Sequence, residues 1–428
     1  MKKVLMIAYY FPPLGGAGVQ RTVRFVKYLP KFGWIPTVIT VKDNRYYPKD
    51  ESLLNKIPKK VEVIRIPGFE FLNYYNQAKK FKMHKVISFF DKITAIPDSQ
   101  TFWKNNVKRK LPKLINLPSF DLVYATYGPG SNLLIGKWLK QHYNSPFIID
   151  FRDEWANNPH IKSKIWLRIK QPIFAKLERQ CIKDSDKVIC LNEVMRERFL
   201  LRYQGENKDK FVIIPNSYDK EDFKIKKEPQ DLFLNLDKFN IVYTGSFYGF
   251  RTPRKFFESV IKLIQEKPSY QEKIRIYFIG KVGTPEILDF IKKEPLKKIV
   301  KIVPYIPHDK LVQYLYNADL LLLIIGEMPG AEGVYTGKLF EYIAIEKPIL
   351  AIVPPNGAAA QVIRETNSGF IANHASIKDI KRTIDFLYQQ WRKKELTLQQ
   401  NKKAVIKYSA ENLTKKLVSV FDKVIESQ

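Results

Sequence analysis

The sequence predicts an α/β protein of two domains, each built on a parallel sheet with helices packed against it. Short apolar runs alternate with amphipathic helical patterns from end to end, which is typical of parallel βαβ units. The alternation is interrupted after residue 215 by a charged, proline-containing stretch typical of a linker. The chain of 428 residues is long enough for two to three domains of about 150 residues each.

The N-terminal domain is expected to span 1–215. Its apolar runs predict strands over 4–9, 37–40, 61–66, 122–125, 147–151, 187–190 and 211–214. Helical patterns lie between these runs, as over 19–29, where Val19, Val23 and Val26 share one face and polar residues occupy the other.

The C-terminal domain is expected to follow a linker over 216–237 and to span 238–408. Its predicted strands are 241–244, 273–279, 299–303, 320–324 and 348–353, and residues 376–428 read as two or three helices. We expect a C-terminal helix over 409–428 to pack back on the N-terminal domain. Two α/β domains joined by a short hinge leave a cleft between them, which is a favoured place for a ligand.

The chain is strongly basic. Its 73 Lys and Arg residues against 43 Asp and Glu residues give a net charge of +30, which attracts nucleic acid, acidic lipid headgroups or phosphorylated small molecules. The longest apolar run, 320–325, is far short of the roughly 20 residues of a membrane-spanning helix. Prolines and glycines over 12–16 replace a signal-peptide cleavage site, so we expect a cytoplasmic protein. Cys181 and Cys190 form no metal-ligand motif and are expected to be reduced, buried thiols.

A glycine-rich turn follows the first predicted strand. Gly15, Gly16 and Gly18 let the backbone approach a ligand closely, and the helix that follows offers free N–H groups to an anion. Their spacing is not that of a dinucleotide-binding turn, which disfavours a dehydrogenase. The turn therefore predicts a phosphate site, although a simple tight connection stays open.

A more specific motif lies over 333–342, with the sequence GVYTGKLFEY. A helix is predicted to begin near Gly337, whose N–H groups suit phosphate oxygens, and Lys338 adds a positive charge. Glu341 lies one turn deeper on the same face, where it is placed to accept hydrogen bonds from ribose hydroxyls. The alternative of a capping box is weakened, because Lys stands at 338 where that motif needs Ser or Thr.

Four motifs together resemble a known family. They are YFPP over 10–13 with Gly15 and Gly16, DFRDEW over 150–155, Pro215-Asn216 with Asp219 and Phe223, and GKLFEY over 337–342. In this order, over nearly the whole chain, they resemble the retaining glycosyltransferases of the family 4 type, which serve bacterial cell-surface polysaccharide biosynthesis. The resemblance implies the GT-B fold, in which two Rossmann-like domains face each other across a cleft.

The resemblance also implies the reaction and its donor. A sugar moves from a nucleoside diphosphate, UDP by default, to a hydroxyl of a glycan or lipid-linked acceptor. The residues that match the family's donor site are Gly15, Gly16, Gly245, Arg251, Arg254, Gly337, Lys338 and Glu341. Lys338 and Arg251 would stabilise the leaving diphosphate, which itself takes the acceptor's proton, so no protein nucleophile, metal or other cofactor is expected.

The chain departs from the family pattern at two places. The family's paired glutamates are usually eight residues apart, but position 333 is Gly and the nearest acid, Glu332, is one residue out of register. The first-domain histidine of many members is also not evident. The acidic triplet over 184–186 resembles a metal motif of another fold class, but it falls between a predicted helix and strand, so we interpret it as a connecting turn.

The motif over 150–155 lies at the carboxyl end of a predicted strand, where open α/β sheets bind ligands. Asp150 and Asp153 are candidates to orient or deprotonate an acceptor hydroxyl, and Asp153 is the preferred catalytic candidate. Trp155 offers a flat apolar face to a sugar ring. The alternative is an ion pair between Arg152 and an aspartate that shapes the loop.

Residues 71–114 carry ten Lys and Arg against two acids, interleaved with eight aromatic residues. Such a segment suits an anionic bilayer, and we expect it to hold the protein peripherally on the inner face of the cell membrane. A solvated face over core-packed aromatics stays open.

Two other functions stay open. A nucleotide-sugar epimerase or hydrolase of the same architecture would release free nucleotide without an acceptor. A non-enzymatic polyanion-binding protein would explain the charge but not the arrangement from Gly337 to Glu341, and would bind with a steep salt dependence. We expect a nucleotide sugar, a glycan or lipid-linked acceptor and an anionic membrane as partners, and no nucleic acid.

Overall fold

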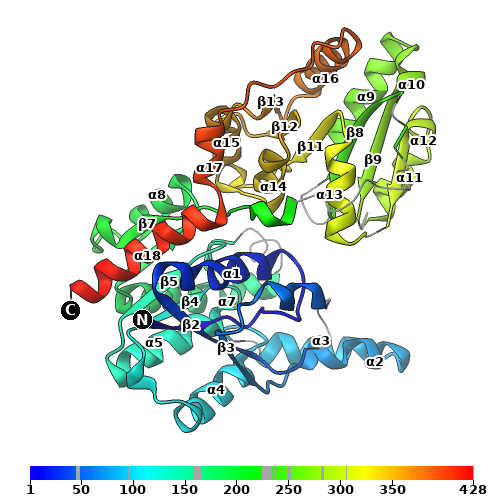
Figure 1. The fold of residues 1–428 in the computed structure, drawn as a ribbon. Helices are drawn as coiled ribbons and strands as arrows, with labels where there is room; N and C mark the ends of the chain where they lie inside the picture. Colours follow the sequence, from blue (N-terminus) through cyan, green and yellow to red (C-terminus); the bar gives the residue numbers. More distant parts are fainter. Residues whose placement is uncertain are drawn as a thin grey trace. The chain divides into compact units, whose positions relative to one another are not determined.

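The chain forms two compact units in the computed structural model (Figure 1). Unit 1 consists of Met1–Pro215 with Ala410–Gln428, and unit 2 of Asn216–Ser409. The structure describes residues 1–427 except 45–48, 95, 159–164, 224–233, 236, 248–251, 281–283 and 305.

Unit 1 is built on a seven-stranded parallel sheet with the strand order β3-β2-β1-β4-β5-β6-β7. Its strands are β1 (Lys2–Ile7), β2 (Trp34–Val41), β3 (Glu62–Ile66), β4 (Leu122–Thr126), β5 (Phe147–Asp150), β6 (Lys187–Cys190) and β7 (Phe211–Ile213). Its helices are α1 (Ala17–Tyr28), α2 (Tyr75–Lys80), α3 (His84–Thr94), α4 (Thr101–Leu114), α5 (Gly130–Tyr143), α7 (Ile165–Asp184), α8 (Glu193–Arg202) and α18 (Ala410–Glu426).

Unit 2 is built on a six-stranded parallel sheet with the order β10-β9-β8-β11-β12-β13. Its strands are β8 (Phe239–Thr244), β9 (Ile274–Ile279), β10 (Val300–Val303), β11 (Leu320–Ile324), β12 (Ile349–Val353) and β13 (Gly369–Asn373). Its helices are α9 (Arg254–Glu266), α10 (Tyr270–Lys273), α11 (Pro285–Ile291), α12 (Leu296–Ile299), α13 (His308–Tyr316), α14 (Gly337–Ile345), α15 (Ala358–Thr366), α16 (Ile377–Arg392) and α17 (Lys402–Lys407).

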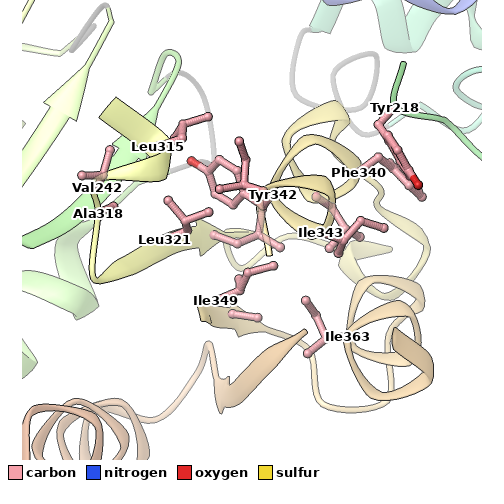
Figure 2. Close-up of a cluster of buried hydrophobic side chains, with 14 of the residues drawn as sticks. Tyr218, Val242, Leu315, Ala318, Leu321, Phe340, Tyr342, Ile343, Ile349 and Ile363 are labelled. Carbon is pink, nitrogen blue, oxygen red and sulfur yellow. The ribbon is translucent and has the colours of Figure 1, made fainter. Parts of the chain in front are cut away.

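Helices cover both faces of the unit 2 sheet. Alternate residues of β11 enter different core clusters, Leu321 on one face and Leu320 on the other, because successive side chains of a strand point to opposite sides. Figure 2 shows Tyr342 and Ile343 of α14 packed near Leu321. This packing fixes α14 against the sheet, with its N-terminus at Gly337.

The predicted class of two parallel-sheet α/β domains is confirmed, and the predicted strands lie within a few residues of the observed ones. The strand β13 was not predicted, because it is a five-residue edge strand that begins with Gly369 and ends with Asn373. A Cβ at Gly369 would collide with the carbonyl oxygen of Ile349, which explains the glycine at this close strand pairing.

Part of the segment predicted as a linker packs in the core of unit 2. Tyr218 and Phe223 are 4% and 7% exposed, and the backbone of Tyr218 bonds to that of Tyr408. The charged composition over 216–237 hid these buried rings. The last helix, α18, packs in unit 1, where the Phe421 ring lies 5.1 Å from Trp34 and 5.9 Å from Tyr124.

Candidate active site

The loops after β8 and β9 meet backbone to backbone at the carboxyl edge of the unit 2 sheet. Gly245 and Gly280 have φ angles of 103° and 132°, which favour glycine. The N–H of Gly245 donates to the carbonyl of Ile279 at 2.7 Å. A Cβ on Gly280 would lie 2.6 Å from the carbonyl oxygen of Gly245. Two glycines therefore leave this edge of the sheet open to a neighbouring group.

That group is the side chain of Lys338. A Cβ on Gly245 would lie 2.5 Å from Lys338 Cε and 2.8 Å from its Nζ. The ammonium donates to the Tyr243 hydroxyl at 2.7 Å and lies 4.0 Å from the centre of that ring, which is a cation–π geometry. Tyr243 in turn stacks on Phe247 with a centroid distance of 4.3 Å. A positive charge is thus held at the end of β8 by a fixed aromatic pair.

The N-terminus of α14 lies beside this lysine in the sequence and opens at Gly337. The N-cap residue Thr336 makes no side-chain cap, and its buried hydroxyl has no hydrogen-bond partner among the described residues. The first turn of α14 has no acidic residue. Because the N–H groups of a first helical turn lack intrahelical acceptors and carry a partial positive charge, this helix end can bind an anion.

Glu341 lies in the second turn of α14 and is half-buried. The next residue, Tyr342, is buried and its hydroxyl bonds to the N–H and hydroxyl of Thr244 at 3.0 and 3.1 Å. Burial raises the pKa of this tyrosine. The bond fastens α14 to the end of β8, where Lys338 meets Gly245, and Glu341 follows three residues after Lys338 on the same helix.

The structure does not add Arg254 to this cluster. Arg254 opens α9, is exposed, and lies 3.0 Å from Glu258 and 3.6 Å from Glu286. No bond between Arg254 and α14 occurs in the described part of the chain. The other predicted arginine, Arg251, lies outside the described residues.

The carboxyl edge of the unit 1 sheet carries the glycine-rich turn. Gly15 precedes Gly16, which has a φ of 94° and is the N-cap of α1. Arg152 donates to the carbonyl oxygens of Gly18, Tyr127 at 2.9 Å and Gly128 at 2.7 Å. A Cβ on Gly18 or Gly128 would lie 2.9 or 2.5 Å from this guanidinium. Arg152 therefore ties the first turn of α1 to the loops that follow β4 and β5.

Asp150 has a different role from the one we predicted. It is fully buried, and its two oxygens accept from Arg21 at 2.8 Å each, while one also accepts from the Tyr124 hydroxyl at 2.6 Å. Burial, followed by the Asp150 charge, raises the pKa of Tyr124 well above its usual value. No side-chain surface is left for an acceptor, so this geometry argues against acceptor binding. Asp150 does form an ion pair, but with Arg21 and not with Arg152, the arginine that we named.

Trp155 is also a core residue instead of an open platform. It is 2% exposed, stacks on Tyr127 at 5.7 Å, and donates its backbone N–H to Glu178 at 3.0 Å. This burial argues against its predicted contact with an acceptor. Asp153, in contrast, is exposed at the end of β5 and stays the candidate for orienting an acceptor hydroxyl.

Sequence reasoning missed Tyr243 and Gly280, and it gave Arg152 an aspartate partner instead of the backbone carbonyls to which it donates. Tyr243 falls inside an apolar strand and reads as core. Gly280 directly follows the apolar run of β9, a signal that matches Gly245 after β8 and that could have been noticed. The bonds from Arg152 reach carbonyls far apart in the sequence, which no local pattern reveals.

The acidic triplet over 184–186 is a connecting turn, as we interpreted it. Asp184 and Asp186 pair with Lys137 and Lys140 at 3.8 and 3.0 Å. Within the described ranges, no group of three or more His, Cys, Asp and Glu side chains is arranged to hold a metal ion. Cys181 and Cys190 are free and buried, as predicted, and burial raises the pKa of both thiols. Among the described helices, none has the length and apolar character needed to cross a bilayer.

Two open parallel sheets, each with a glycine-rich turn at its carboxyl edge and one with a cationic helix N-terminus, define a two-domain α/β protein of the GT-B class. Residues 15–217 match the glycosyl transferase 4-like domain, and residues 224–405 match the glycosyl transferases group 1. The two matches follow one another along the chain, a glycosyl transferase 4-like domain and then a glycosyl transferases group 1 domain, and together they cover most of it.

Solved structures share this fold over their whole length. Sucrose-phosphate synthase from Thermosynechococcus elongatus is 14% identical, with a TM-score of 0.66 and 100% of each chain covered. Anabaena HepE, solved with UDP and glucose, is 12% identical, with a TM-score of 0.66, covering 99% of this chain and 100% of its own. At these identities the likeness concerns the fold alone.

One curated relative adds a sequence match. The protein TuaH of Bacillus subtilis (strain 168), described as a teichuronic acid biosynthesis glycosyltransferase, is 20% identical over 214 residues. The match spans 50% of this chain and 52% of TuaH, so it covers about half of each protein.

Proposed function

We propose that the protein transfers a sugar from a nucleoside diphosphate sugar, UDP-linked, to a hydroxyl of a glycan or lipid-linked acceptor, with retention at the anomeric carbon. One observation carries the proposal: Lys338 is held over Gly245 beside the open N-terminus of α14, with Glu341 one turn further along. A diphosphate fits the cationic helix end, and a ribose next to it would donate its hydroxyls to Glu341.

Two comparisons support the donor and the setting. HepE, which shares the fold, was solved with UDP and glucose, and TuaH is described as acting in teichuronic acid biosynthesis. We accordingly assign this chain to cell-surface polysaccharide biosynthesis on the cytoplasmic side of the membrane, as a peripheral protein. The proposal extends what these names say of other proteins to this chain.

In the proposed reaction, the bond between the anomeric carbon and the diphosphate oxygen breaks while the acceptor oxygen bonds to that carbon on the same face. The acceptor's proton passes to the departing diphosphate oxygen. The negative charge that develops on the diphosphate is stabilised by Lys338 and the α14 N-terminus, and such electrostatic stabilisation is usually the largest catalytic contribution. No protein nucleophile and no metal ion is needed. Arg251, which lies outside the described residues, stays a predicted contact of the diphosphate.

The remaining groups position the acceptor and the donor. Asp153, exposed after β5, is proposed to orient the acceptor hydroxyl. Gly15 and Gly16 are proposed to contact the donor through their backbone, since Gly16 opens α1 with a φ of 94°. Alignment of two substrates supplies a further part of the rate enhancement.

Transfer is tested with UDP-, GDP-, TDP- and ADP-sugars and a lipid extract as acceptor. We expect product from a UDP-sugar, with the anomeric configuration of the donor kept when the new bond is examined by NMR. Lys338→Ala is expected to lower turnover about 10²-fold, because one stabilising charge is lost in the transition state. Lys310→Ala, which removes an exposed lysine from α13, is the control.

An inverted product would overturn the proposed stereochemistry. Release of free UDP at the same rate with and without acceptor would instead favour the hydrolase or epimerase alternative. Normal turnover of Lys338→Ala would remove this lysine from the mechanism.

A further inference from the structure

The turn that joins α2 and α3 exposes large apolar side chains. Phe81 and Met83 are 75% and 55% exposed, and Lys82 between them has a φ of 58°, which is uncommon for a residue other than glycine. Val86 and Phe89 on α3 are 46% and 52% exposed. We call Phe81, Met83, Val86 and Phe89 the apolar tip.

The apolar tip belongs to a hairpin that extends away from the unit 1 sheet (Figure 1). Helices α2 and α3 pack on each other and on the short 3₁₀ helix Phe71–Tyr74. At the base of the hairpin, Phe71 meets the Phe69 and Phe102 rings at 5.0 and 6.3 Å. The hairpin is thus joined to unit 1 at its base, where Phe69, Tyr74 and Phe102 are 40–45% exposed, and its turn carries the more exposed Phe81 and Met83.

The structure shows which part of the basic aromatic segment 71–114 can contact a membrane. The apolar side of α4 is core, because Trp103, Val107 and Leu111 are each fully buried. For α4, these three residues fit the alternative of a solvated face over core-packed side chains, although Phe102 and Leu114 at its ends are 40% and 56% exposed. Among the described residues of this segment before α4, Phe81 is the most exposed apolar side chain, and lysines precede and follow it in the sequence.

Four lysines surround the apolar tip. Lys79 and Lys80 end α2, Lys82 lies in the turn and Lys85 begins α3, and all four are exposed. Residues 71–90 contain no Asp or Glu. An apolar tip ringed by lysines is complementary to a surface that is anionic outside and apolar beneath, as an acidic lipid bilayer is.

A soluble polyanion fits this surface less well. Nucleic acid would pair with the lysines and could stack on Phe81, but Met83 and Val86 have no flat face for a base. Contacts of Met83 and Val86 stabilise a complex only if their apolar surface is removed from water. The apolar composition therefore favours lipid over nucleic acid.

We propose that the apolar tip inserts into the headgroup region of an anionic bilayer while Lys79, Lys80, Lys82 and Lys85 contact acidic lipids. This docking does not depend on the donor site. Its consequence for acceptor choice rests on the proposed function: a transferase held at the bilayer would meet a lipid-linked acceptor.

The first test is flotation of the full chain with vesicles of phosphatidylcholine, with and without phosphatidylglycerol. We expect binding to the anionic vesicles. The double variant Phe81→Ser/Met83→Ser is expected to bind at least about tenfold more weakly, because two apolar side chains no longer leave water. The control Leu288→Ser/Phe386→Ser removes side chains that are 38% and 48% exposed in unit 2, and should bind normally.

The second test removes charge. Replacing Lys79, Lys80, Lys82 and Lys85 by Gln is expected to weaken binding about fivefold per lysine and to reduce its dependence on salt. The matched control replaces four exposed lysines of unit 2, namely Lys262, Lys293, Lys297 and Lys393. An equal loss in both variants would mean that only the overall charge matters and would overturn the proposal.

The third test detects insertion directly. Cys181 and Cys190 are fully buried, so Phe81→Cys can be labelled selectively with a solvatochromic thiol reagent. We expect its emission to shift to shorter wavelength on anionic vesicles and to be quenched by a lipid-borne quencher, whereas Leu288→Cys should respond to neither. An equal shift with soluble heparin, or no shift on vesicles, would overturn the proposal. Thermal stabilisation by UDP, measured on the same variants, should not change. This measurement distinguishes a failure of the membrane-docking proposal from a failure of the proposed donor site.

Discussion

At the scale of single residues, the charged groups at the carboxyl ends of the two sheets divide into those that are fully buried and those that are partly exposed. Asp150 is fully enclosed by Arg21 and Tyr124, so we assign it to the structure of unit 1. Lys338 and Glu341 are half-buried on a helix whose N-cap hydroxyl has no partner in the part of the chain that the structure describes. In the sequence, Asp150 looked as suitable for a ligand site as Lys338 and Glu341, because all three are charged residues in a family motif. Only their burial in the structure distinguishes Asp150 from the other two.

Asp150→Asn tests this division. Replacing Asp150 takes the carboxylate away from the buried Arg21 charge, so we expect unit 1 to lose about 3–5 kcal/mol of unfolding free energy in a denaturant titration. The control Asp209→Asn changes an exposed acid of the same unit and should be nearly neutral. A variant of normal stability that has lost activity would restore Asp150 as an acceptor-binding residue.

At the scale of elements, Arg152, which follows β5, connects to the first turn of α1 and to the loop after β4 by donating to the carbonyls of Gly18, Tyr127 and Gly128. Arg152→Lys keeps the charge, but the lysine ammonium lacks the planar guanidinium whose several N–H groups donate to three carbonyls at once. We expect a loss of turnover of about tenfold or more, because small displacements of positioning loops are costly. UDP affinity should change less than turnover, since most of the proposed nucleotide contacts lie in unit 2.

The control for this prediction is Arg109→Lys, whose exposed guanidinium bonds to Asn106 on its own helix. Thermal unfolding of both variants separates a positioning role from general instability. Unchanged turnover of Arg152→Lys would show that these segments hold their places without it.

The last helix, α18, is a second element whose role can be measured. Phe421 is fully buried against the Trp34 and Tyr124 rings. Phe421→Ala is expected to lower the stability of unit 1 by about 3–5 kcal/mol, while unit 2 is unaffected. Hydrogen exchange resolved by segment would report both units, with the half-exposed Phe386→Ala as control. Equal loosening of the two units would contradict the assignment of α18 to unit 1.

Most strands could be predicted because a buried parallel strand is a short apolar run, as in the Leu-rich β11. The helix at Gly337 could be placed because glycine and a following lysine mark an anion-binding helix end. Edge strand β13, the buried Tyr218 and the enclosed Trp155 could not, because their burial depends on partners distant in the sequence. For the same reason, the sequence suggested an ion pair of Arg152 with an aspartate, whereas the pair is Arg21 with Asp150.

At the scale of the whole molecule, two adjacent chain segments leave unit 2. The backbone N–H of Tyr218 donates to the carbonyl of Tyr408 at 3.1 Å, next to the points where the chain passes to Pro215 and to Ala410. Unit 1 thus includes both termini of the sequence described here. The net charge of +30 suits two anionic partners that we propose, namely a nucleotide sugar and an acidic bilayer.

The central claim is that the N-terminus of α14 grips the diphosphate of a UDP-sugar and that Glu341 holds its ribose. Calorimetric titration of the full chain with UDP tests it most directly, with Glu341→Ala, Lys338→Ala and, at the far end of α14, the control Glu346→Ala. We expect the dissociation constant to rise about tenfold or more in the first two variants, because each loses hydrogen bonds in which one partner is charged. The control should bind UDP as the unmodified chain does. Equal affinity of Glu341→Ala and the unmodified chain would contradict the account.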